Sequence, residues 1–205
     1  MSGMFITFEG PDGCGKSTIT SLVYDKLKDK YNVIKTREPG GTEISEKIRD
    51  LILDVSNEKM TYRTEALLYA ASRAQHVEEK IIPAIKEGKI VLCERFVLSS
   101  VAYQGYGRGL GEEDVMMINN FATGGVKPDI TFLFDMKGKS SVTRKLELGG
   151  DRLENSGDLF HKKVNEAYTE LSKRNDYCII DATKSIDEVL NDCLEILEAK
   201  LGGIK

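Results

Sequence analysis

Short apolar runs alternate with longer stretches of helical periodicity along the whole chain. The apolar runs predict buried strands at 5–9, 33–36, 90–93, 130–135 and 177–180. Apolar residues at helical spacing between them predict helices near 17–30, 43–54, 62–86, 112–123, 156–174 and 185–200. Because strands and helices alternate, the pattern favours an α/β fold with a parallel sheet.

The length of 205 residues suits a single domain, 1–205, with a sizeable core. The stretch 137–157 is polar and contains several glycines, which predicts a flexible lid or, equally, a solvated connection. Arg144 and Arg152 lie in it. On a mobile lid they could neutralise and shelter a migrating phosphoryl group, but they could also be solvated surface charges.

A formal net charge of −4 and a pI of about 5.4 argue against a non-specific nucleic-acid or anionic-membrane binder. No apolar run is long enough to span a bilayer, and we see no secretion signal, so we expect a cytoplasmic protein. The cysteines lie far apart and lack the spacing of metal ligands.

Residues 10–17, G-P-D-G-C-G-K-S, match the phosphate-binding pattern G-x-x-x-x-G-K-[ST] between a predicted strand and a predicted helix. The glycines let backbone N–H groups point at an anion, and the helix N-terminus adds partial positive charge. Lys16 can then reach the β- and γ-phosphates, while the Ser17 hydroxyl can bind Mg²⁺. The residues expected to bind ATP are Gly10, Pro11, Asp12, Gly13, Cys14, Gly15, Lys16, Ser17 and Thr18.

Charged residues follow two other predicted strands, at the sheet edge where ligands of open α/β folds bind. Glu94 and Arg95 end an apolar strand, so Glu94 could hold Mg²⁺ and Arg95 could clamp a phosphate. An internal ion pair is the alternative. Glu38 follows the second strand and could belong to a site or to an exposed pair. Asp12 could accept a bond from a substrate hydroxyl or simply cap its loop.

Tyr69 and Arg73 are four residues apart on a predicted helix, so they share one face. The tyrosine could stack on a base and the arginine could bond its edge. For His76, one turn on, a structural hydrogen bond is the favoured interpretation. Residues 99–109 could recognise a base edge, or could form only a polar helix end and turn. Arg49 alone suggests a surface arginine.

Four motifs occur in order: F-E-G-P-D-G-C-G-K-S-T, T-R-E-P-G-G-T, L-Y-A-A-S-R-A-Q-H, and E-R-F followed by S-S-V-A-Y-Q-G-Y-G-R-G. With them the chain resembles the bacterial thymidylate kinases from Phe5 to the final helix. The resemblance implies a three-layer P-loop NTPase fold, a five-stranded parallel sheet wrapped by helices, and usually a homodimer. It also implies transfer of the γ-phosphoryl group of ATP to dTMP with Mg²⁺, giving dTDP for dTTP biosynthesis, with Lys16, Glu94 and Arg95 as catalytic residues.

The resemblance further implies roles around the dTMP sugar and phosphate. Asp12 matches the carboxylate on the 3′-hydroxyl side, and Glu38 matches the acidic residue near sugar and phosphate. Arg49 and Arg95 match arginines at the dTMP phosphate. Tyr103 matches the ring that disfavours ribose.

The thymine base has its own set of matching positions. Tyr69 takes the stacking place, usually phenylalanine, and Arg73 matches the arginine that bonds a carbonyl. Ser100 and Gln104 match polar contacts to the base. The chain departs from the family by carrying Glu94 where aspartate is usual, and by having few cations in the lid.

Other functions fit parts of this sequence. The chain could be a kinase for another nucleoside monophosphate, or a nucleotide-binding protein that has lost catalysis. A GTP-dependent switch is disfavoured because no Asn-Lys-x-Asp guanine-recognition sequence occurs.

Overall fold

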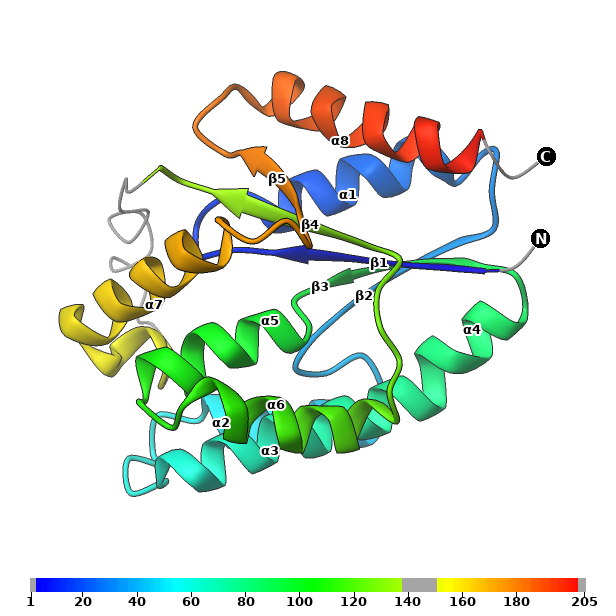
Figure 1. The fold of residues 1–205 in the computed structure, drawn as a ribbon. Helices are drawn as coiled ribbons and strands as arrows, with labels where there is room; N and C mark the ends of the chain where they lie inside the picture. Colours follow the sequence, from blue (N-terminus) through cyan, green and yellow to red (C-terminus); the bar gives the residue numbers. More distant parts are fainter. Residues whose placement is uncertain (1–2, 138–150, 203–205) are drawn as a thin grey trace.

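The computed structural model describes residues 3–137 and 151–202. Its centre is a five-stranded, fully parallel sheet with strand order β2-β3-β1-β4-β5 (Figure 1). The strands are β1 (Met4–Glu9), β2 (Val33–Arg37), β3 (Ile90–Glu94), β4 (Ile130–Asp135) and β5 (Cys178–Asp181). The predicted α/β class and the five strands are therefore confirmed, with ends that move by a residue.

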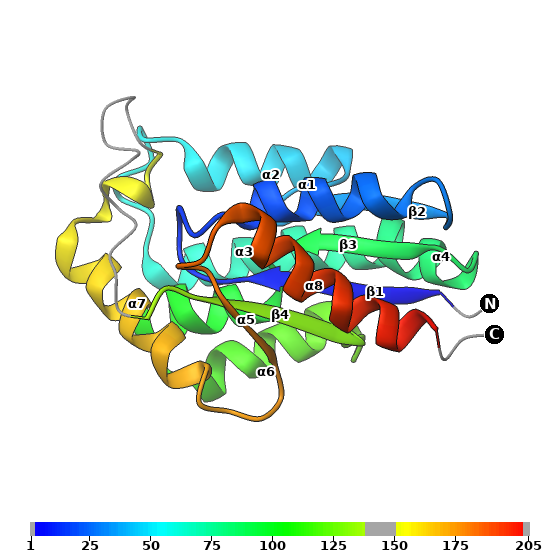
Figure 2. The same ribbon diagram turned by 90° about the horizontal axis from the view of Figure 1, so that it is seen from above.

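One face of the sheet is covered by α1 (Lys16–Leu27) and α8 (Ile186–Leu201), which Figure 2 shows lying over the strands. Successive side chains of β1 point to opposite faces of the sheet. Met4, Ile6 and Phe8 therefore share the face toward these helices and are buried with them. Helix α8 begins with a capping box in which Ser185 and Glu188 bond each other's backbone N–H groups.

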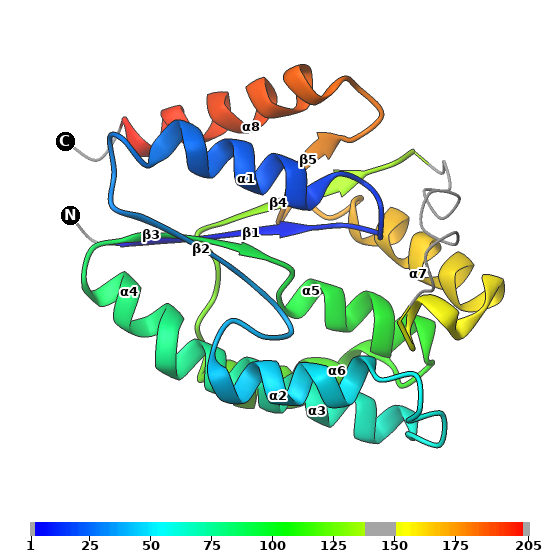
Figure 3. The same ribbon diagram turned by 180° about the vertical axis from the view of Figure 1, so that it is seen from behind.

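The opposite face carries the remaining helices, as Figures 1 and 3 show. Phe5 points to this side and forms a T-shaped pair with Phe96, with ring centroids 5.0 Å apart. The helices are α2 (Glu43–Leu53), α3 (Tyr62–His76), α4 (Ile82–Lys86), α5 (Val97–Ser100), α6 (Glu112–Thr123) and α7 (Asp158–Leu171). No helix in the described part of the chain is long and apolar enough to cross a membrane.

Two helical predictions need correction. The continuous helix expected over 62–86 contains a π-helical segment, Val77–Ile81, between α3 and α4. The stretch 99–109, expected as a base-recognising loop or as a polar helix end and turn, lies mostly in α5 and in a π-helical segment, Val101–Gly107. Serines and glycines give this stretch low helix propensity, but Leu98, Val101 and Ala102 are buried, so tertiary packing stabilises the helix.

Candidate active site

The glycine-rich loop connects β1 to α1 at the carboxyl edge of the sheet. Gly13 has φ 74° and Gly15 has φ 93°, which are left-handed values that glycine adopts without steric cost. Lys16 begins α1, and its buried Nζ donates to the carbonyl oxygens of Gly10 at 3.0 Å and Pro11 at 2.7 Å. The Lys16 ammonium group thus lies within the loop that is expected to bind phosphates.

Ser17 and Glu94 lie side by side next to this loop. The Ser17 hydroxyl donates to Glu94 Oε1 at 2.7 Å. Magnesium prefers such oxygen ligands and keeps several of its own waters. The pair therefore fits a Mg²⁺ ion, and the longer side chain of Glu94 still brings its carboxylate to the serine.

A cavity of about 250 Å³ opens beside the loop, at the carboxyl ends of β1, β2 and β3. All nine residues that the sequence assigned to the second substrate line it, together with Ser17 and Glu94. These nine are Asp12, Glu38, Arg49, Tyr69, Arg73, Arg95, Ser100, Tyr103 and Gln104. Residues from four separate motifs therefore meet around one cavity.

Arg95 connects the loop to this cavity. Its guanidinium donates to Asp12 at 2.6 Å, to the Gly10 carbonyl at 3.2 Å and to Ser99 at 3.0 Å. Arg95 has φ 64°, a strained value for a residue with a side chain, and such strain concentrates at functional sites. Asp12 also accepts from the Tyr103 hydroxyl at 2.5 Å, so its side chain bonds two residues that line the cavity.

Arg73 is 2% exposed and held on several sides. Its Nε donates to Glu38 at 2.7 Å, and Nη2 donates to the Phe96 carbonyl at 2.9 Å. Nη1 donates to Ser100 at 3.0 Å and to Asn119. Because these partners come from separate segments, the fold fixes the plane of this guanidinium before any ligand binds.

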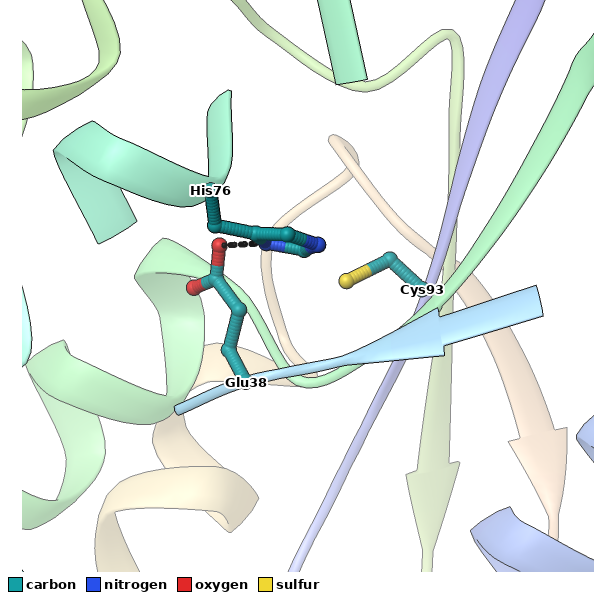
Figure 4. Close-up of side chains that lie close together, drawn as sticks. All are labelled: Glu38, His76 and Cys93. Atoms are coloured by element: carbon teal, nitrogen blue, oxygen red, sulfur yellow. Dashed lines mark hydrogen bonds and ion pairs between the residues drawn. The ribbon is translucent and has the colours of Figure 1, made fainter. Parts of the chain in front are cut away.

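Glu38, the carboxylate partner of Arg73, also forms a buried group with His76 and Cys93, in which one polar side-chain atom of each lies within 4.8 Å of the others (Figure 4). His76 bonds Glu38 through Nδ1 at 2.9 Å and Thr36 through Nε2 at 2.7 Å. Burial raises the pKa of the Cys93 thiol well above its usual value, which favours the protonated form. Since both histidine nitrogens are already bonded, the group supports Arg73 rather than a metal, and His76 makes the structural hydrogen bonds expected of it.

Arg37 and Glu38 do not pair with each other, although the sequence presents them as a charged pair. Arg37 bonds Glu46 at 3.0 Å, while Glu38 turns inward to Arg73. Strand β2 ends at Arg37 and the chain bends at Glu38, so the two side chains take different partners.

Comparison with known proteins gives a consistent match. The family model described as thymidylate kinase matches residues 8–193. The chain is 58% identical to a thymidylate kinase of Finegoldia magna, covering 96% of this chain and 98% of that protein. The corresponding protein of Lactobacillus helveticus is 52% identical, covering 98% of both. The chain belongs to the thymidylate kinase family.

A solved thymidylate kinase from Ehrlichia chaffeensis has the same fold, with a TM-score of 0.77 and 32% identity. The match covers 97% of this chain and 99% of that one. The sheet and helices described above therefore form a P-loop NTPase fold, the fold of that solved thymidylate kinase.

Three buried residues near the cavity were assigned no role from the sequence. Glu9 accepts from the Phe96 N–H and from Ser99, and burial raises its pKa. Asn119 bonds Arg73, and Glu65 bonds two arginines. Glu9 carries a signal, a carboxylate ending an apolar strand just before the phosphate loop. Glu65 and Asn119 carry none, because their partners lie far away in the sequence.

The stretch predicted as a lid, 137–157, is described at residue 137 and from residue 151 onward, so Arg144 lies outside the described residues. Arg152 donates to Glu65 at 2.8 Å and to the Ile52 carbonyl at 2.7 Å. Its neighbours Asp151 and Leu153 line the cavity. Burial raises the pKa of the Asp151 carboxyl above its ordinary value.

Proposed function

We propose that this chain phosphorylates dTMP to dTDP with ATP and Mg²⁺, supplying dTTP biosynthesis. The observation that carries the proposal is the cavity beside the phosphate loop, which gathers the nine residues assigned to the second substrate. Family membership supports it, because similar proteins over nearly the full chain are named thymidylate kinases.

The phosphate loop binds the ATP phosphates in this proposal. Lys16 exchanges its bonds to the loop carbonyls for bonds to the β- and γ-phosphates, and there stabilises the charge that develops during transfer. Ser17 and Glu94 hold Mg²⁺, which when bound would neutralise phosphate charge. Arg144 is proposed to act from the lid, whereas Arg152, which is bonded to Glu65 and to the Ile52 carbonyl, is proposed to hold the end of the lid in place.

The cavity binds dTMP. Arg95 orients the acceptor phosphate for attack, assisted by Arg49, while Asp12 contacts the sugar. Tyr103 packs beside the sugar, where a ribose 2′-hydroxyl would be crowded. Tyr69 and Arg73 contact the base, together with Ser100 and Gln104.

The deciding measurement is ADP formation with ATP and Mg²⁺ and each of dTMP, dUMP, dGMP and AMP. We expect the highest kcat/KM with dTMP. A clear preference for another monophosphate would make the chain a different nucleotide kinase. No turnover with any of the four would indicate a binding protein without catalysis.

We further propose that the chain folds as one domain, 1–205, and acts as a cytoplasmic homodimer. Helices α3 and α6 pack together and expose Leu67 at 56%, Met117 at 63% and Phe121 at 91%. Large exposed apolar side chains on adjacent helices favour an interface. Four free cysteines suit a reducing compartment. Sedimentation of wild type and Phe121→Asp should show a dimer and a monomer, respectively.

A further inference from the structure

Glu65, on the first turn of α3, is fully buried and receives four hydrogen bonds. Its Oε1 accepts from Gln104 Nε2 at 3.0 Å and Arg108 Nε at 3.1 Å. Its Oε2 accepts from Arg108 Nη2 at 3.0 Å and Arg152 Nη2 at 2.8 Å. Glu65 does not line the cavity, whereas Gln104 does. Any influence of Glu65 on a ligand must therefore pass through its neighbours.

These bonds decide which end of the Gln104 amide faces the cavity. A primary amide carries two N–H donors on nitrogen and an acceptor on oxygen, and the two ends can exchange by rotation. A carboxylate bonded by two guanidinium groups offers only acceptors, so Gln104 must turn its nitrogen toward Glu65. The amide oxygen then lies at the other end of the group and can accept a bond from a ligand in the cavity.

The neighbouring groups keep Glu65 in this position. Arg108 donates a second time, to Ser156 at 2.8 Å, and its guanidinium stacks on the Phe160 ring at 4.1 Å. Arg152 also bonds the Ile52 carbonyl at 2.7 Å. Arg108 and Arg152 are therefore each fixed by contacts other than their ion pair with Glu65. Rotation of the Glu65 carboxylate would break both ion pairs.

We propose that Glu65 is a positioning residue for base selection. By holding the Gln104 nitrogen, it makes the Gln104 oxygen an acceptor for bases that carry a hydrogen on ring nitrogen 3. The proposal rests on the function proposed above and adds to it. Thymine carries that N–H, whereas cytosine has a lone pair at the same place. An acceptor from Gln104 facing cytosine would leave two lone pairs opposed, which is costly in a buried site.

Glu65→Gln tests this assignment. A glutamine at 65 can donate or accept, so the Gln104 amide is free to rotate and present its N–H₂ to cytosine. We expect the ratio of kcat/KM for dTMP over dCMP to fall about tenfold or more, since one mismatched buried bond is worth roughly 1–3 kcal/mol. KM for ATP should stay within about twofold. Glu78→Gln, an exposed glutamate beyond the end of α3, is the matched control and should keep the wild-type ratio.

A double-mutant cycle separates positioning from general support of the fold. If Glu65 acts through Gln104, Glu65→Gln should leave the dTMP:dCMP ratio unchanged in a Gln104→Met background. An equal fall of the ratio in both backgrounds would overturn the proposal. So would a folded Glu65→Gln enzyme with the full wild-type preference.

The charge left behind by Glu65→Gln also needs control, because two buried guanidinium groups lose their carboxylate. Glu65→Gln/Arg152→Gln removes one cation with the anion and should show the same loss of preference in a more stable protein. Thermal unfolding measures the stability of both variants.

Gln104→Met in the otherwise wild-type protein should lower the dTMP:dCMP ratio of kcat/KM to a similar extent, and an unchanged ratio there would also reject the proposal. Wild type without dTMP turnover would instead reject the proposed function.

Discussion

Lys16 and Arg73 are both nearly fully buried cations of the candidate active site, but their partners differ in kind. Lys16 donates to backbone carbonyls of its own loop, within six residues. Arg73 donates to Glu38, Ser100, Asn119 and the Phe96 carbonyl, which are at least 23 residues away. The phosphate side of the site is therefore built locally, and the acceptor side is built by the whole fold.

This difference has consequences for substitutions. The carbonyl bonds of Lys16 can be exchanged for bonds to phosphate without disturbing other segments, so its loss should affect chemistry more than folding. Arg73 neutralises the buried carboxylate of Glu38, so its loss should affect both binding and stability. The following variants are ordered by the size of their expected effect on turnover or selectivity.

Lys16→Ala should have the largest effect. Loss of one preorganised electrostatic donor commonly costs about 10²–10³ in kcat. Because the lysine ammonium hydrogen-bonds within its own loop, the melting temperature should change little. Steady-state kinetics and thermal unfolding of the same preparation measure both quantities. Near-normal turnover in the folded variant would contradict the role of the phosphate loop in catalysis.

Arg95→Ala should have the second largest effect, because Arg95 contacts both the phosphate side and the acceptor side of the site. It bonds Asp12 and the Gly10 carbonyl in the loop, and Ser99 and Tyr103 around the cavity. Losing a charge-assisted bond of about 1.5–3 kcal/mol should raise KM for dTMP and lower kcat, for a combined loss of tens-fold to about a hundredfold.

The matched control for Arg95 is Arg174→Ala, which removes a surface ion pair with Glu112 away from the cavity. It should leave the kinetics of both substrates unchanged. If Arg95→Ala changed only the kinetics toward ATP, Arg95 would belong to the donor side.

The same difference between contacts within one loop and contacts between distant segments explains what could be predicted from the sequence. The phosphate loop is readable because its chemistry needs residues at fixed, short spacing between a strand and a helix. Spacing alone suggests a base-binding role for Tyr69 and Arg73, but other cavity residues are readable only through the resemblance, since Arg49 taken alone suggests a surface arginine. Glu65 and Asn119 were missed because their bonds join segments 39–87 and 46 residues apart. Nothing in local periodicity encodes such contacts.

Arg73→Ala should have the third largest effect and should act on base selectivity. Four N–H groups of Arg73 are bonded within the protein, and the fifth, on Nη2, can donate to the O4 carbonyl of thymine. Cytosine carries an amino group there, so two donors would oppose each other. We expect the dTMP:dCMP ratio of kcat/KM to fall about tenfold.

Stability complicates this variant, because removing one partner of a buried ion pair costs about 3–5 kcal/mol. Arg73→Lys keeps a cation beside Glu38 but loses the planar fork, so it should fold better and still lose selectivity. Either variant with the full wild-type preference for dTMP over dCMP would exclude Arg73 from reading the base.

Tyr69 should have a smaller effect on base selectivity than Arg73, because it contributes a surface to stack on rather than a directed bond. Burial, with a smaller contribution from the Glu65 carboxylate, raises the pKa of the Tyr69 hydroxyl above its usual value, so the ring stays neutral at any working pH. Tyr69→Ala should weaken dTMP and dCMP alike by roughly 1–3 kcal/mol, as expected for lost base stacking. Tyr69→Phe keeps the ring and should stay within about 0.5 kcal/mol of wild type. The measurement is kcat/KM for both pyrimidine monophosphates at pH 7 and 9. A change in the dTMP:dCMP ratio for Tyr69→Ala, or a large loss for Tyr69→Phe, would mean that the hydroxyl reads the base, and that stacking is not the main role of this residue.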